Sequence, residues 1–402
     1  MSILRFNYGN VNDEYEYKDK QLGFIDSCLD EDQIRQHFAA TYIGCQTNQG
    51  RKPLDPVIPY KAHLLYFLKR EIVSFNELPK QVEDKPDYRA FCRSDGITFT
   101  SGYLSLFRKE HLTPQMAAQL HEDILNALEL ESNTLSMRIG MWDSVPMPSY
   151  SSPYKDTKHC DCEEPCNCPK HFSDRDATIG WQSPTPTRKD KFLGYRKHTV
   201  LLYDQDKNQR LPIATNAQPA NKPDIEIIEE LLKACKGKLD ILLVDQAIYD
   251  FQQILDWHED YHILVLVKPK KNAVLPEYPI SDTGTPCCPQ MEKPLEWSHV
   301  DWDDEVHIYH CTELNCFYRH ECPCQFEIPM EKHPALLGAF PAHTRCGRLL
   351  LSLRRLIEPE FGMQTLWSKL KNLPFRRLLN FRLLAQLVDT ATLLRKVAQK
   401  FT

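Results

Sequence analysis

The stretch from Ile241 to Val244 constrains the fold most, because its four apolar residues run directly into the carboxylate of Asp245. A short apolar run with polar sequence on both sides predicts a strand that is buried on both faces. Aspartate is a poor strand former and avoids burial, so we expect Asp245 at the carboxyl end of that strand. The chain should therefore build a sheet that is covered on both sides.

Alternating strand and helix patterns surround this run. Residues 223–237 have helical periodicity and stop at Gly237, a residue suited to the end of a helix. Residues 250–259 predict a second helix, and residues 261–269 predict another strand. Three earlier segments predict strands, and the last two form a hairpin: 135–143, 192–204 and 211–218. This order predicts an α/β fold with a mixed sheet.

The rest of the chain differs in character from this centre. Residues 1–130 are mostly helical in pattern, since apolar residues recur every three or four positions. Residues 271–345 contain many prolines and cysteines and are too long for an ordinary loop, so they predict an insertion with its own small structure. The last residues are helical and basic. We therefore expect three regions: a helical N-terminal domain (1–130), an α/β domain (131–270 and 346–402) and a Cys-containing insertion (271–345).

Composition and charge bound the class of protein. The chain of 402 residues has no apolar window of membrane-spanning length and no apolar N-terminal run with a basic flank. We therefore expect a cytoplasmic protein without a membrane partner. The net charge of -6 argues against a uniformly basic nucleic-acid-binding surface. Residues 343–402 nevertheless carry twelve Lys and Arg against three Asp and Glu. That segment fits a polyanion contact on one face or, equally, a basic helix that solvates its outer face.

The 15 cysteines need an explanation other than disulfides, which are unusual in a reducing compartment. Eight of them form two clusters, and clustered cysteines in such a chain first indicate a metal. Zinc takes four thiolate or imidazole ligands tetrahedrally; the alternative is a set of reduced loop thiols. The candidate zinc ligands are Cys160, Cys162, Cys166 and Cys168 in the first cluster, with His159 and His171 beside them, and Cys311, Cys316, Cys322 and Cys324 in the second.

Two predicted strands end on an acid, at Asp143 and at Asp245. If these strands are neighbours, both carboxylates project from one edge of the sheet, where ligands of open α/β sheets bind. The carboxylates would repel each other unless a cation lies between them, and oxygen ligands suit Mg²⁺ or Mn²⁺. A third acid from residues 354–362 would complete a site for two ions, which can clamp both oxygens of an in-line phosphoryl transfer. The simpler alternative is that each aspartate begins a turn or caps a helix.

A series of motifs resembles bacterial insertion-sequence transposases of the DDE type: MWDSVPM, FSDRDATIG, FLGYRKHTVLLYD, IATNAQPANKPD, LLVDQAIYD and RRLIEPEFG, in this order. Residues 63–92 and 103–112 resemble the helical N-terminal domain found with that catalytic core, so the resemblance covers roughly residues 60–395. It implies a ribonuclease-H-like mixed sheet with an insertion before the last catalytic helix. It also implies an Asp-Asp-Glu triad that binds two divalent ions, and the matching acids are Asp143, Asp245 and Glu358.

The surroundings of the third acid depart from the family pattern. That pattern has an Arg about one turn before the Glu and a Lys about two turns after it. Arg354 fits the first position relative to Glu358, but Thr365 stands near the second. Pro359 is another departure, and either the helix begins here with Pro359 in its first turn or it kinks. Glu360 is therefore an alternative third ligand.

The resemblance further implies a DNA transposase that cuts at transposon ends and joins the 3′-hydroxyl to target DNA. One ion would activate the attacking water or hydroxyl, and the other would stabilise the leaving 3′-oxygen. The expected partners are DNA and a second copy of the chain, with association with the nucleoid when DNA is bound. The helical N-terminal domain (1–130) is expected to bind the DNA ends or to mediate their pairing. Side chains expected at DNA phosphates, or alternatively simple exposed helix charges, are Arg354, Arg355, Lys369 and Lys371.

Two other functions stay open: a catalytically inactive, transposase-derived DNA-binding protein, and a metal-dependent nuclease of the same fold. Pro359 and the displaced Lys favour the former. The second cysteine cluster resembles a cysteine-bearing insertion that some of these transposases carry before the Glu.

Several further residues are expected to be structural. Asp174 and Asp176 match a family segment, but their spacing before a glycine is typical of a turn. His198 lies within a predicted strand and should be buried and hydrogen-bonded. Asp250 opens a predicted helix and should cap it. Two tryptophans of the insertion favour packing in a small core over stacking on a displaced base: Trp297 and Trp302.

Overall fold

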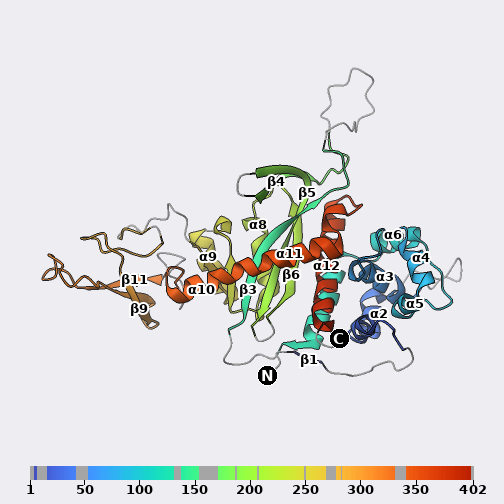
Figure 1. The fold of residues 1–402 in the computed structure, drawn as a ribbon, viewed down its shortest axis with the longest axis horizontal. Helices are drawn as coiled ribbons and strands as arrows, with labels where there is room; N and C mark the ends of the chain where they lie inside the picture. The colour runs from blue at the N-terminus through green and yellow to red at the C-terminus, as the bar shows by residue number, and fades with distance from the viewer. Residues whose placement is uncertain are drawn as a thin grey trace, which may run out of the picture.

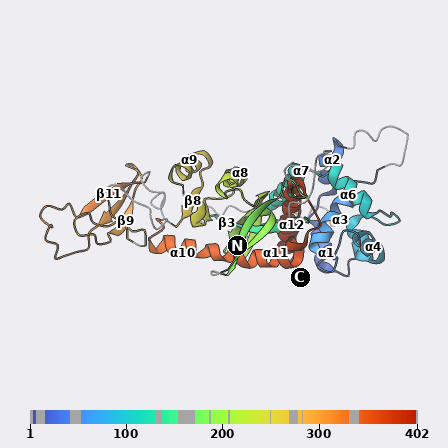
Figure 2. The same cartoon turned by 90° about the horizontal axis from the view of Figure 1, so that it is seen from above.

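The computed structural model describes residues 4–6, 16–41, 53–130, 137–153, 171–185, 188–205, 208–248, 250–268, 278–281, 283–330 and 341–399. Figure 1 and Figure 2 show an elongated arrangement of these residues, with the N-terminal helices at one end and the strands of the insertion at the other. The central sheet lies between them. This arrangement agrees with three regions, while their boundaries stay a proposal.

The N-terminal residues form helices, as their periodicity predicts: α1 (Lys20–Ser27), α2 (Glu31–Ala39), α3 (Val57–Leu68), α4 (Leu78–Asp84), α5 (Pro86–Cys92), α6 (Ser101–Glu110) and α7 (Pro114–Ala127). Every residue of α3 is buried, as expected for a helix that is apolar around most of its circumference. Its fully buried Lys61 pairs with Asp26 at 2.7 Å and Glu31 at 2.5 Å, so the buried charge is compensated. A short strand after α7, β2 (Leu128–Leu130), pairs with β1 (Leu4–Phe6).

In the described residues the central sheet has six strands: β3 (Ile139–Pro148), β4 (Thr178–Thr185), β5 (Arg188–Asp204), β6 (Gln209–Pro219), β7 (Ile241–Val244) and β8 (Leu264–Val267). Their order is β4-β5-β3-β7-β8, and β6 also pairs with β5. β5 is antiparallel to β3, β4 and β6, whereas β3, β7 and β8 are parallel, so the predicted mixed sheet is confirmed. The predicted helices on either side of β7 are α8 (Ile225–Cys235) and α9 (Phe251–Tyr261).

Two strands differ from the sequence prediction. β4 was not predicted; the only expectation close to it was a turn at Asp174 and Asp176. β3 does not end at Asp143 but continues for five residues, to Pro148. The reason is the length of β5, whose seventeen residues offer pairing partners as far as Pro148. Val145 and Met147 are buried along this extension, so it also adds to the core.

The C-terminal residues form α10 (Arg345–Leu353), a 3₁₀ turn η5 (Arg354–Leu356), α11 (Ile357–Ser368) and α12 (Leu378–Ala398). Figure 2 shows α8 and α9 on one face of the sheet and α10 and α11 on the other. α12 contacts β6 of the sheet as well as α3 and α7 of the N-terminal region. One continuous hydrophobic core includes the N-terminal helices, the sheet and α12. None of the described helices is long and apolar enough to span a membrane.

The described part of the insertion contains a small sheet that is separate from the central one. Three antiparallel strands build it: β9 (Glu296–Asp301), β10 (Val306–His310) and β11 (Gln325–Pro329). Buried side chains of these strands and of the segment before β9 form a small core: Cys288, Leu295, Tyr309, Phe326 and Ile328. Val300 of β9 packs against the main core instead.

Candidate active site

The two aspartates lie level with each other on neighbouring strands. In the parallel pair of β3 and β7, Met141 lies opposite Leu243, and continuing this register by two residues puts Asp143 opposite Asp245. β3 and β7 are therefore neighbours, which is the condition stated above for both carboxylates to project from one edge of the sheet. β7 ends just before Asp245, whereas Asp143 lies within β3. The acids meet because the shorter strand ends beside the middle of the longer one.

Arg354, in the turn between α10 and α11, reaches both acids. Its Nη1 donates a hydrogen bond to Asp143 Oδ2 at 2.8 Å, and its Nη2 lies 3.9 Å from Asp245 Oδ1. The two carboxylate side chains are 27% and 55% exposed, respectively, so the pair is open to solvent on one side. The guanidinium offsets the repulsion between the two negative charges. The residues here thus suit a positive charge, and carboxylate oxygens are the ligands that Mg²⁺ and Mn²⁺ prefer.

The surroundings shift the pKa of Asp143. Burial raises this pKa, while the Ser144 backbone N–H and the Arg354 guanidinium oppose the rise; the charge of Asp245 adds to it. An acid that is costly to ionise in isolation becomes easier to ionise when a cation lies beside it. The pair therefore has the electrostatic character of a cation-binding site.

Asp224, the residue before α8, is a third carboxylate that interacts electrostatically with Asp143 and Asp245. Burial raises its pKa, Arg196 lowers it, and the charges of Asp143 and Asp245 raise it. Asp224 is not among the site residues predicted from the sequence. Asp224 is the last residue of PANKPD, which belongs to the series of motifs, and this position could have marked it as a candidate. The spacing of that segment in the sequence does not show that it lies near Asp143 and Asp245.

Glu358, the expected third acid, does not form one metal-binding group with Asp143 and Asp245 in the described residues. α11 begins at Ile357, so Pro359 falls in the first turn, where a backbone N–H has no partner within the helix to lose. Because α10, η5 and α11 follow one another without a gap, the structure also has the interruption of a longer helical run that is the second alternative for Pro359. Across the described ranges, no group of three His, Cys, Asp or Glu residues is arranged to hold a metal ion.

The surroundings of the two glutamates distinguish them. Glu360 is only 3% exposed, and its Oε2 lies 2.6 Å from Lys396 Nζ, so its charge is compensated inside the core. Glu358 is exposed and lies about one turn beyond Arg354, which reaches the aspartates. This arrangement favours Glu358 over Glu360 as the third ligand.

The basic residues expected at DNA phosphates lie in different environments. Lys369 points to the end of α3, where its Nζ donates to the carbonyls of Tyr66 at 3.3 Å and Lys69 at 3.5 Å. Burial lowers the pKa of Lys369 to about 8. Its ammonium is therefore engaged with the N-terminal region. Arg355 and Lys371 are exposed and fit the expected DNA contact better.

Asp174 and Asp176 are structural, as expected, but their role is larger than that of a turn. Asp174 is fully buried and accepts hydrogen bonds from the hydroxyl of Tyr195 at 2.9 Å and the backbone N–H of Arg377. Asp176 accepts from the backbone N–H of Leu378 at 3.1 Å. Two acids from a distant segment thus cap the first turn of α12.

The other structural expectations have mixed outcomes. Asp250 accepts a hydrogen bond from the Gln253 backbone N–H at 3.2 Å, so the predicted cap of α9 is confirmed. His198 is buried and stacks on Trp142 with ring centroids 5.6 Å apart. The expected hydrogen bond of its ring is wrong, since neither nitrogen has a hydrogen-bond partner among the described residues. Burial lowers the pKa of His198 to about 3, so the ring is neutral.

Of the two cysteine clusters, only the second lies within the described residues. Cys160, Cys162, Cys166 and Cys168 lie outside the described residues. The second cluster is described, and its four thiols are partly exposed and unbonded to one another as disulfides: Cys311, Cys316, Cys322 and Cys324. Trp297 packs on the core of the insertion, as expected, and its Nε1 donates to His307 Nδ1 at 3.0 Å. The packing expected for Trp302 is wrong, because this side chain is 61% exposed.

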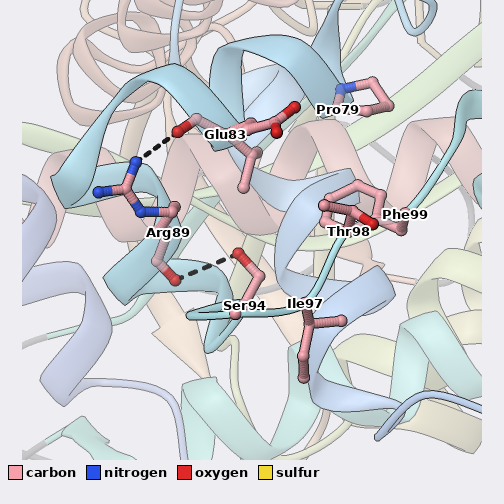
Figure 3. A pocket seen from close by; sticks show the side chains of 9 residues that line it. Pro79, Glu83, Arg89, Ser94, Ile97, Thr98 and Phe99 are labelled. Carbon is pink, nitrogen blue, oxygen red and sulfur yellow. Dashed lines mark hydrogen bonds between the residues drawn. The ribbon is translucent and has the colours of Figure 1, made fainter.

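A cavity of about 330 Å³ lies between α4 and the loop after α5 (Figure 3). Figure 3 shows the Arg89 guanidinium donating to the Glu83 carbonyl at its border. Ile97 and Phe99 supply apolar lining. No residue of the acid site lines this cavity, so it belongs to the N-terminal helices alone.

Comparison with protein families places this site in context. A family described as a transposase DDE domain matches residues 141–310, and a second described as a transposase domain matches residues 10–110. Together they span about two thirds of the chain. The first match begins two residues before Asp143 and includes Asp224 and Asp245, but it stops before Glu358. The second begins at residue 10, well before the start of the resemblance described above. No curated protein matches the chain.

The mixed sheet with paired carboxylates on adjacent strands defines an α/β protein of the ribonuclease-H-like class. Within that class, the chain belongs to the insertion-sequence transposases of the DDE type. Members of this family act on DNA and generally use divalent metal ions.

Proposed function

We propose that this protein cuts DNA at transposon ends and joins the resulting 3′-hydroxyl to target DNA by two-metal phosphoryl transfer. The observation that carries the proposal is the register of β3 and β7, which puts Asp143 level with Asp245. If each aspartate only began a turn or capped a helix, no cation shared by the two would be needed. Arg354 nevertheless reaches both carboxylates. The membership in the DDE family supports the same conclusion.

In this proposal, Asp143, Asp245 and Glu358 would hold the ions. Two divalent ions, when bound, stabilise the attacking and leaving oxygens of an in-line displacement at phosphorus. Asp143 would supply its carboxylate from within β3, and Asp245 would supply one from the position directly after β7. Glu358 completes the set from the first turn of α11, which requires the two aspartates and this turn to come closer together.

Arg354 has two consecutive roles in this proposal. It first orients both carboxylates, as its contacts indicate. With ions held by the aspartates, its guanidinium would be free to bind a DNA phosphate through two parallel N–H donors. Arg355 and Lys371, both exposed, neutralise neighbouring phosphates and position DNA without specifying its sequence. A homodimer on DNA, holding two transposon ends, is part of the same proposal.

One observation favours a second candidate, a catalytically inactive, transposase-derived DNA-binding protein. Glu358 is not arranged with the aspartates in the described residues. Pro359 by itself does not exclude catalysis, because a proline in the first turn of α11 is tolerated.

The test is an end-cleavage assay with Mg²⁺ or Mn²⁺ on DNA that carries the terminal repeats of the element. We expect Asp245→Asn to bind these ends and to lower cleavage by more than about 100-fold, a loss larger than that for residues outside the ligand shell. Asp250→Ala is the matched control, since it removes only a helix cap nearby and should keep cleavage within a few-fold. Joined products on a supercoiled target distinguish a transposase from a nuclease. Cleavage by Asp245→Asn at the normal rate would contradict the metal assignment, and no cleavage by the unaltered chain would favour the inactive candidate.

A further inference from the structure

The carboxyl end of β3 meets the segment that leads into α12. The backbone N–H of Tyr150, two residues beyond β3, donates to the Phe375 carbonyl at 3.1 Å. Arg376 Nε in turn donates to the Tyr150 carbonyl at 2.6 Å. Arg376 and Tyr150 are both exposed, the latter to 66%. This junction of two distant segments therefore presents a guanidinium and an aromatic side chain at the surface.

Two more arginines lie at the same junction. The backbone N–H of Arg377 donates to Asp174 at 3.1 Å, and that of Leu378 donates to Asp176 at 3.1 Å. Arg175 stands between these two acids in the sequence and is exposed. The side chain of Arg377 is 53% exposed. We name the three exposed arginines the arginine patch: Arg175, Arg376 and Arg377.

Arg377 has a backbone conformation that arginine rarely adopts. Its φ is 78° and its ψ is 136°. A side chain collides with the backbone at such angles, whereas glycine adopts them readily. The bond from its N–H to the buried Asp174 holds this conformation, and that bond does not involve the Arg377 side chain. Glycine could therefore make the same bond without the strain.

The side chain of Arg377 adds little to the fold that would offset this strain. Its Nη1 lies 3.6 Å from Asp176 Oδ1, and the two side chains are 53% and 38% exposed. Ion pairs as exposed as this one contribute little to stability. Arg93 is a contrast, because it also has a positive φ, of 55°, but pairs with Asp26 at 2.9 Å and Glu31 at 2.7 Å. The guanidinium of Arg377 is therefore presented to solvent, where a negatively charged ligand can reach it.

The arginine patch continues the surface that the proposed DNA contact uses. Arg355 precedes α11, Lys371 follows it, and Arg376 comes five residues later. The twelve residues of α11 span about 18 Å, which corresponds to about five steps of 3.4 Å along duplex DNA. A duplex that lies along α11 with its cut at the acid pair would thus bring phosphates several base pairs away to the arginine patch.

We propose that Arg376 and Arg377, with Arg175 beside them, bind backbone phosphates of duplex DNA several base pairs from the cut. Tyr150 lies against the sugars between these phosphates. The strained backbone of Arg377 directs its guanidinium away from the fold and toward the DNA. The patch positions the duplex without reading its sequence, because phosphates are the same at every base pair. The proposal rests on the action of this family on DNA, not on the cleavage proposed above.

Arg377→Gly tests the proposal because it should change stability and DNA binding in opposite directions. In urea denaturation we expect the midpoint of the full chain to rise, since relief of strain exceeds the entropy that glycine adds to the unfolded chain. Affinity for a fluorescent duplex that carries the terminal repeat, measured by anisotropy, should fall about tenfold at low salt. The slope of log affinity against log salt should become shallower by about 0.9, the loss of one phosphate contact.

Further variants check that the contact is between side-chain charge and the DNA backbone. Arg377→Lys keeps the charge and should keep the salt slope, whereas Arg376→Gln and Arg175→Gln should each weaken binding. Each loss should be equal for the terminal-repeat duplex and for a duplex of unrelated sequence, since backbone contacts carry no sequence information. Lys233→Gln is the matched control, because this exposed lysine belongs to α8 on the other face of the sheet (Figure 2). It should leave affinity and slope unchanged.

Three results would overturn the proposal. The first is an Arg377→Gly variant with unchanged affinity and salt slope. The second is a lower denaturation midpoint for that variant, because the side chain would then serve the fold. The third is an unaltered chain that binds neither duplex. Cleavage is not measured in these experiments, so a chain that binds DNA but does not cut it would contradict the proposed function and leave this contact in place.

Discussion

Asp143 shows how one residue depends on several elements. It lies inside a long strand, so the sheet fixes its backbone, and burial makes its ionised form costly. Arg354 comes from the far end of the sequence and compensates that cost at 2.8 Å. The sequence identifies Asp143 as an acid next to an apolar run. The sequence does not show that Arg354 is the cation nearest to Asp143, because the two residues come together only when α10 and α11 cross the sheet.

Asp174 leads to a residue-scale prediction about stability. Replacing Asp174 with Ala leaves the Tyr195 hydroxyl and the Arg377 backbone N–H without their hydrogen-bond acceptor. Each buried donor without a partner lowers the free energy of unfolding by about 1–3 kcal/mol. We expect Asp174→Ala to lower the free energy of unfolding by about 3 kcal/mol, measured by urea denaturation.

Asp176→Ala provides the control for that measurement, because Asp176 is partly exposed and its loss should cost less than about 1 kcal/mol. A variant Asp174→Ala with normal stability but no DNA cleavage would contradict the structural role and would instead indicate a catalytic one.

At the scale of elements, the attachment of the C-terminal helices to the sheet rests on a buried polar network. Lys197 of β5 and Asp389 of α12 are both fully buried, and their charged atoms are 2.7 Å apart. Gln364 of α11 donates to the same carboxylate at 2.8 Å, and the hydroxyl of Thr199 also donates to it, at 3.1 Å. One carboxylate therefore joins a strand to two helices, of which α11 also carries Glu358.

We expect Lys197→Met to lower the free energy of unfolding by about 3–5 kcal/mol, because it leaves the charge of Asp389 buried without a partner. The double variant Lys197→Met, Asp389→Leu should recover much of that loss, since apolar replacements of a buried pair are often tolerated. Urea denaturation of the four proteins of this cycle gives the coupling between the two residues. Additive losses would show that the pair is not coupled.

The elements differ in how well the sequence predicts them. The alternation around Asp245 correctly predicts β7, α9 and the cap at Asp250, because these signals are local. The end of β3 is not predictable from its own residues, since pairing with the long β5 decides it. Lys197, Asp224 and Asp389 show the same limit. Their roles depend on burial, which no local pattern of charged residues reveals.

For the whole molecule, the main consequence is that residues 1–130 do not have a core of their own. Helix α12 is buried along most of its length and contacts the sheet on one side and α3 and α7 on the other. Arg395 of α12 also donates to the Phe67 carbonyl at 3.1 Å. The regions that sequence analysis separates at residue 130 are therefore joined by the last helix of the chain.

We expect the N-terminal helices and the central sheet to unfold in one transition. The six tryptophans all lie between residues 142 and 367, so fluorescence reports on the sheet and insertion, while circular dichroism reports on all helices. In a variant with Trp297 and Trp302 changed to Phe, both signals should give the same denaturation midpoint. Two separate midpoints would contradict a shared core.

Helix α11 is attached at both of its ends to different parts of the molecule. Before its first turn, Arg354 contacts the acid pair; after its last turn, Lys369 contacts the carbonyls that end α3. Its twelve residues span about 18 Å as a stiff rod. A movement of α3 on binding DNA would therefore shift the Glu358 turn relative to the aspartates. In the proposed function, α11 would transmit such a movement to Glu358. The approach of Glu358 to Asp143 and Asp245 would then depend on DNA bound to the N-terminal helices.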